Sequence, residues 1–157
     1  MTDDLTGRDQ LIEAFAWWKL KLPGGQVLLA DAATNALVAG LDGIALAELA
    51  GIHKGENPFE VDNLIDRVAN ELDLDPRILA KPESLAIRRM CREVLAGRLS
   101  ERALSGWVHT RFHHESDFEP LNQLAILDDD FDDLEYAGRD TSPVRIQIRE
   151  IAAAIVQ

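Results

Sequence analysis

The stretch "LNQLAILDDDFDDLEYAG", residues 121–138, decides which fold class the sequence predicts. Five aspartates and one glutamate occupy the eight positions 128–135. The apolar side chains around them recur every three or four residues, as on one face of an α-helix: Leu121, Leu124, Leu127, Phe131 and Leu134. The segment therefore predicts a helix over about 120–136 with one buried face and one strongly acidic face.

The acidic residues of this segment leave two local structures open. In an unbroken helix, Asp128/Asp132 and Asp129/Asp133 are like charges four residues apart, and each pair costs about 0.2–0.5 kcal/mol. A break at 127–128 would instead make Asp128 an N-cap, with its neighbours in a first turn where the helix dipole favours carboxylates.

The same periodicity runs through the rest of the chain. Thr6, Asn57 and Ser100 are residue types that favour a helix N-cap, and each precedes an apolar pattern of helical spacing. The predicted helices cover about 7–22, 26–39, 44–50, 58–72, 83–96, 101–113, 120–136 and 144–157. We expect an all-α fold, a compact bundle of about seven to eight helices whose N-terminal and C-terminal halves pack together.

The length of 157 residues favours a single helical domain over 1–157. Within it, residues 1–74 and 83–157 form possible halves, and 75–82 reads as the connector. The only cysteine is Cys91, so no intrachain disulfide can form.

The net charge of −12 narrows the choice of partners. A negative surface is repelled by nucleic-acid phosphates and by anionic membranes, so we expect neither as a partner. No apolar run approaches the length of about 18 residues that a membrane-spanning helix needs. The N-terminal segment also lacks the apolar core of a signal peptide, which predicts a cytoplasmic protein.

No catalytic constellation is recognisable in the sequence. Ser100, Ser105 and Ser116 lie in no known nucleophile context, and Cys91 lies on an apolar helix face. The aspartate cluster does not match a calcium-binding EF-hand, because its twelfth position is Arg139 rather than a glutamate. The sequence favours a non-enzymatic protein without a cofactor.

A group of histidines gives an alternative function, metal binding. His109 and His113 are four residues apart, which places two imidazoles on one helix face as in zinc sites, and nearby carboxylates could add ligands. Such a pair more often stabilises a helix C-terminus, where the dipole favours a positive charge. The candidate ligands are His109, His113, His114 and Glu115.

An arginine-rich segment precedes the acidic one and should neutralise part of it. Residues 87–111 contain six arginines against two glutamates, and residues 115–140 contain ten acids against one arginine. Helical geometry directs Arg111 toward the buried face of its helix, where it would need a carboxylate. The arginines expected to form structural ion pairs are Arg88, Arg92 and Arg111.

Because the acids outnumber these arginines, a negative surface should remain and could bind another protein, with a basic partner favoured by its charge. Any exposed members of Trp17, Trp18 and Trp107 are candidate anchors. The predicted contact residues are Asp128, Asp129, Asp130, Asp132, Asp133 and Glu135.

Three C-terminal segments resemble a group of small bacterial all-α proteins of uncharacterised function: "LAIRRMCREVLAGRLSERALSGWVHTRFHHE" (85–115), residues 121–138, and "VRIQIREIAAAIV" (144–156). The N-terminal segments 40–52 and 60–74 resemble a second segment often joined to it. This resemblance implies a helical fold and no activity. The chain is also similar, in size and charge only, to small acidic immunity proteins that neutralise basic bacterial toxins.

Overall fold

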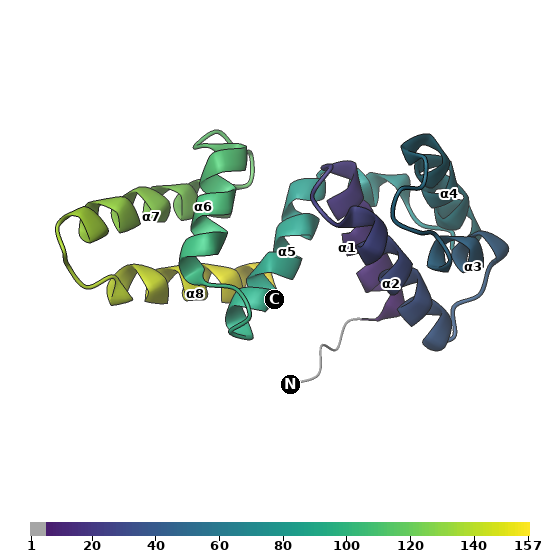
Figure 1. The fold of residues 1–157 in the computed structure, drawn as a ribbon, viewed down its shortest axis with the longest axis horizontal. Helices are drawn as coiled ribbons and strands as arrows, with labels where there is room; N and C mark the ends of the chain where they lie inside the picture. The colour runs from purple at the N-terminus through teal and green to yellow at the C-terminus, as the bar shows by residue number, and fades with distance from the viewer. Residues whose placement is uncertain (1–5) are drawn as a thin grey trace. The chain divides into compact units, whose positions relative to one another are not determined.

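The computed structural model describes residues 6–157, and within that range it contains helices and no strand. The first five helical elements are α1 (Gly7–Lys19), α2 (Gly25–Val38), α3 (Ile44–Ala50), α4 (Pro58–Glu71) and the short 3-10 helix η1 (Pro76–Leu79). Four more follow: α5 (Pro82–Leu95), α6 (Glu101–Phe112), α7 (Glu119–Tyr136) and α8 (Ser142–Ile155) (Figure 1). The predicted all-α fold is confirmed.

The chain divides into two compact units, Met1–Ala86 and Ile87–Gln157. The expected connector, 75–82, contains η1 and the first residue of α5, and the boundary between the units falls a few residues later, inside α5. The organisation as one domain stays a prediction.

Each unit has its own apolar core. In the first, α1 packs along α2 so closely that a Cβ on Gly7 would lie 2.8 Å from the Cα of Ala36. The fully buried side chains of this core include Leu11, Phe15, Leu29, Leu46, Leu49 and Val61.

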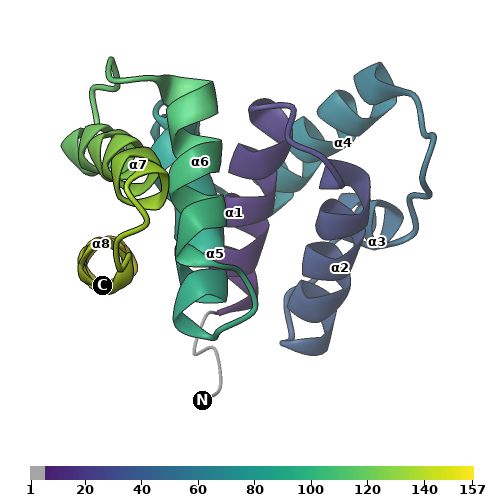
Figure 2. The ribbon, with the colours of Figure 1, turned by 60° about the vertical axis from the view of Figure 1, so that its left-hand side comes forward.

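In the second unit, α6 crosses α7 and α8, which lie side by side (Figures 1 and 2). The apolar residues predicted for α7 fill the core between these helices, with Leu121 and Leu124 fully buried, Phe131 nearly so and Leu127 at 6% exposed. The same core contains Ile87, Cys91, Val94, Leu104, Val108 and Ile148.

The three predicted N-caps are confirmed. Each side chain accepts a hydrogen bond from a backbone N–H two or three residues further on: Thr6 from Asp9, Asn57 from Phe59 and Ser100 from Ala103. None of the helices in residues 6–157 is long and apolar enough to span a membrane.

The acidic segment forms one helix, so the first of the two local structures that the sequence left open is the one present, and there is no break at 127–128. α7 runs from Glu119 to Tyr136, and Asp128 lies in its middle with its side chain buried. The cost of like charges four residues apart must therefore be offset by other contacts, and α6 supplies them.

Candidate functional site

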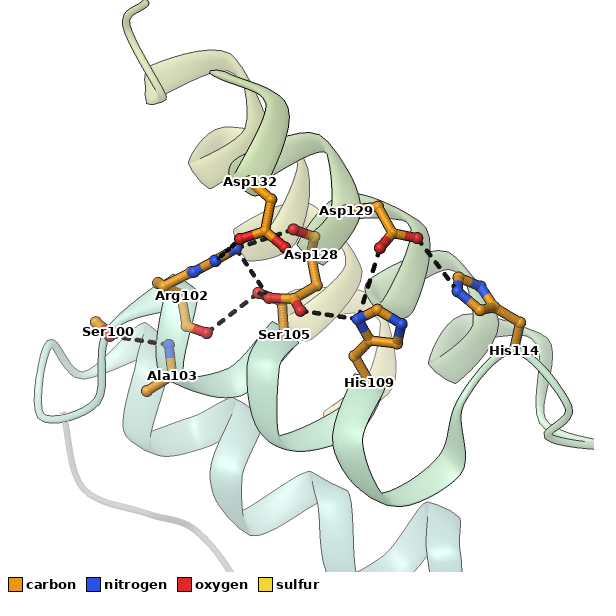
Figure 3. A network of polar contacts seen from close by, with 9 residues as sticks. All are labelled: Ser100, Arg102, Ala103, Ser105, His109, His114, Asp128, Asp129 and Asp132. Atoms are coloured by element: carbon orange, nitrogen blue, oxygen red, sulfur yellow. Dashed lines mark hydrogen bonds and ion pairs between the residues drawn. The ribbon is translucent and has the colours of Figure 1, made fainter. Parts of the chain in front are cut away.

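The candidate site lies where α6 meets the acidic face of α7 (Figure 3). α6 presents Arg102, Ser105 and His109, which are spaced by three and four residues and so share one helix face. This face is polar, in contrast to the neighbouring face with Leu104 and Val108, which lies in the core.

Asp128 is the centre of this contact. Its carboxylate accepts three hydrogen bonds from α6: Oδ1 from Arg102 Nη1 at 3.0 Å and from Ser105 Oγ at 3.0 Å, and Oδ2 from His109 Nδ1 at 2.9 Å. The side chain is only 10% exposed. A carboxylate that has lost its water needs such donors, and here each oxygen has at least one.

Arg102 joins two of the aspartates that repel each other. It donates to the carboxylate and the backbone carbonyl of Asp128, and its other terminal nitrogen pairs with Asp132. Its guanidinium also lies 5.1 Å from the centre of the Phe131 ring. Partial burial alone would lower the pKa of Arg102, but the bond to Asp132 and the charges of Asp128, Asp132 and Glu135 outweigh it, so the pKa is raised. This shared cation explains how α7 stays continuous.

The structure adds Arg102, which the sequence did not predict, as an ion-pair partner of the acidic helix. Arg111 is exposed, so the expectation that it lies at the centre of the buried face of α6 is wrong. Arg102 makes a contact with the acidic helix, because it lies seven residues before His109 on the face that meets α7.

Arg88 and Arg92 are both half-buried on α5. Arg88 donates through Nη2 to the carbonyl oxygen of Gln157 at 3.4 Å. Arg98 donates a hydrogen bond to Glu93 and lowers the pKa of that carboxyl, and the charge of Arg92 adds to the lowering. Neither of these interactions involves an aspartate of α7.

The histidine group is only partly assembled as predicted. His109 and His114 face each other edge to face, with ring centres 4.9 Å apart, and Asp129 of α7 lies beside both (Figure 3). His113, the C-cap of α6 with φ of 54°, and Glu115 are exposed and do not belong to this group. The sequence could not identify Asp129 as the third member, because it comes from another helix.

The predicted partner-binding residues divide into two classes. Asp128 is buried, and Asp132 and Asp129 are paired with Arg102 and with the histidines, respectively. Asp130 and Asp133 are exposed, and their side chains form no hydrogen bond or ion pair with any described residue. Glu135 is exposed too, and its charge acts on Arg102.

The tryptophans considered as anchors are each half-buried. The indole Nε1 of Trp17 donates to the carbonyl of Pro23 at 2.9 Å, and that of Trp18 donates to Asp62 at 2.7 Å. Trp107 packs against the core of the second unit. None of the three tryptophans is fully exposed, so an exposed anchor has to be a different side chain.

Comparison of the chain with protein-family models, with curated proteins and with solved structures finds no match in any of the three. The resemblance to a group of small bacterial helical proteins stays a prediction.

Proposed function

We propose that this protein is a non-enzymatic interaction protein that binds a basic protein through the outward face of α7. The observation that carries the proposal is the division of the acidic cluster. α6 neutralises the aspartates that face inward, and the outward Asp130 and Asp133 keep their charge exposed.

The outward face has a regular geometry. Ile126, Asp130 and Asp133 follow one another at spacings of four and three residues, so they form one stripe on the side of α7 away from the core. Ile126 is 51% exposed at one end of this stripe, and Tyr136 at the end of the helix is 96% exposed. An apolar or aromatic side chain among charged ones is typical of the anchors and rims of protein interfaces.

Charge favours a basic protein over the other macromolecules. Exposed carboxylates attract a positive surface and accelerate its association, whereas they repel phosphates. The net charge of −12 for the whole chain likewise attracts a positive partner and repels phosphates. A basic toxin of the kind that acidic immunity proteins neutralise is one partner of this chemistry.

Affinity capture from a lysate of the source organism, followed by binding kinetics with the captured protein, tests the proposal. The variant is Asp130→Asn/Asp133→Asn. The matched control is Glu60→Gln/Asp66→Asn on α4, which removes two exposed carboxylates from the first unit and changes the net charge equally.

We expect a basic protein that the wild type and the control capture equally well, and that associates more slowly with the α7 variant. The association rate should also fall steeply with added salt. A partner that the α7 variant binds as fast as the wild type does would show that this face is not the interface.

A further inference from the structure

A three-residue group between α6 and α7 has the composition and spacing of a metal site. The ligand atoms of His109, His114 and Asp129 all lie within 4.8 Å of one another, and no other such group occurs in residues 6–157. His114 Nε2 is 3.2 Å from Asp129 Oδ2. Two ligands of one tetrahedral zinc ion, at bond lengths of 2.0–2.2 Å, are separated by about 3.3–3.6 Å. This pair is thus close to the distance that a shared ion requires.

Asp128 determines which nitrogen of His109 is available. A carboxylate can only accept a hydrogen bond, so the Nδ1 of His109, at 2.9 Å from Asp128 Oδ2 and 3.8 Å from Asp129 Oδ1, carries the proton. The lone pair of the neutral ring is then on Nε2. Metal-binding histidines usually have their second nitrogen bonded to a carboxylate or carbonyl in this way, which fixes the tautomer and the ring orientation.

The carboxylate that orients His109 is itself held in place. Ser105 Oγ and Arg102 Nη1 both donate to Asp128 Oδ1, and all three residues lie in the buried or half-buried part of the contact. The imidazole of His109 is therefore supported from behind while its other side faces His114 (Figure 3). An exposed histidine without such support would rotate freely, and binding an ion would then cost the conformational entropy of its side chain.

We propose that His109, His114 and Asp129 bind a divalent transition-metal ion, with Asp128 as the positioning residue of His109. Two imidazoles and one carboxylate suit Zn²⁺, whereas Mg²⁺ and Ca²⁺ prefer oxygen ligands alone. Three protein ligands leave the fourth position of the ion to water. Because His109 and Asp129 come from α6 and α7 and His114 from the segment that joins them, the ion cross-links this part of the second unit.

The proposal is tested by titrating Zn²⁺ into tag-free, chelator-treated full-length protein and measuring the heat of binding. The ligand variants are His114→Ala and Asp129→Asn, whose side chains are 44% and 52% exposed, so the fold should tolerate both. The matched controls are His113→Ala and Asp130→Asn, each of which removes the sequence neighbour of a proposed ligand. Circular dichroism of each variant checks that the helices remain.

We expect the wild type and both controls to bind one Zn²⁺ per chain. The loss of an outer-shell partner lowers metal affinity roughly 10–100-fold. Each ligand variant should lose more affinity for Zn²⁺ than that. The wild type loaded with Co²⁺ should show the visible absorption of a four- or five-coordinate ion, a measurement that needs no variant. Absence of saturable Zn²⁺ binding by the wild type would overturn the proposal, and so would equal binding by His114→Ala and His113→Ala.

Discussion

Replacing Asp128 by alanine is the most direct test of how the acidic helix is held in the fold. The substitution removes the carboxylate that accepts bonds from Arg102, Ser105 and His109, and it leaves the rest of the interface between α6 and α7 in place. The question is how much of the lost bonding the neighbouring groups can replace.

The magnitude follows from the alternative acceptors. Arg102 keeps its pair with Asp132 and the backbone carbonyl of residue 128, and Ser105 Oγ can donate to the carbonyl of Arg102 at 3.2 Å. The loss of the bonds from Arg102 and Ser105 to the carboxylate together costs about 1 kcal/mol. The loss of the bond from His109 to this charged group costs about 1.5–3 kcal/mol. Alanine is the better helix former by about 0.7 kcal/mol, and the repulsion from Asp132 falls by about 0.2–0.5 kcal/mol. The net destabilisation is about 2 kcal/mol.

Urea unfolding followed by circular dichroism measures this change, provided that the slope against urea stays constant. The control is Asp130→Ala on the same helix, which loses no hydrogen bond among the described residues and should be neutral or stabilising by up to about 0.7 kcal/mol. Hydrogen exchange should place the loss of protection in α6 and α7 of the second unit. If the alanine variants at positions 128 and 130 are equally stable, the buried carboxylate does not hold the two helices together.

Two further predictions concern residues outside the contact between α6 and α7. Glu71 at the end of α4 accepts hydrogen bonds from the backbone N–H groups of Ala45 and Leu46 at the start of α3. Glu71→Ala should therefore destabilise the first unit by about 1 kcal/mol, the typical cost of a lost N-cap. Hydrogen exchange of α3 should increase, and unchanged exchange would contradict this prediction. Burial raises the pKa of the Cys91 thiol from 9.0 to about 12, although the charge of Arg92 lowers it, so a thiol reagent at neutral pH should modify Cys91 only after unfolding. Rapid labelling of Cys91 in the native protein would refute this prediction. Because the raised pKa belongs to the folded state, the stability that Cys91 contributes is complete below pH 9 and is lost as the pH rises toward 12.

The sequence could predict the helices because their signals are local. Asn57 and Ser100 cap the helices that they were expected to cap, since a capping bond joins residues two or three positions apart. The prediction of the end of α1 was less accurate. It ends at Lys19, before the predicted Leu22, and Lys21 has a left-handed φ of 57° that no residue type in the segment indicated.

The sequence by itself determined that this chain is all-α and that residues 121–138 form an amphipathic, acidic helix, because both follow from spacing along the chain. Only the tertiary structure decided that the helix is unbroken, that Arg102 pairs with it, and that Asp129 joins His109 and His114. These choices depend on the register in which α6 and α7 cross. That register is set by core packing between side chains distant in sequence, such as Leu104 against the apolar face of α7, and no local pattern encodes it.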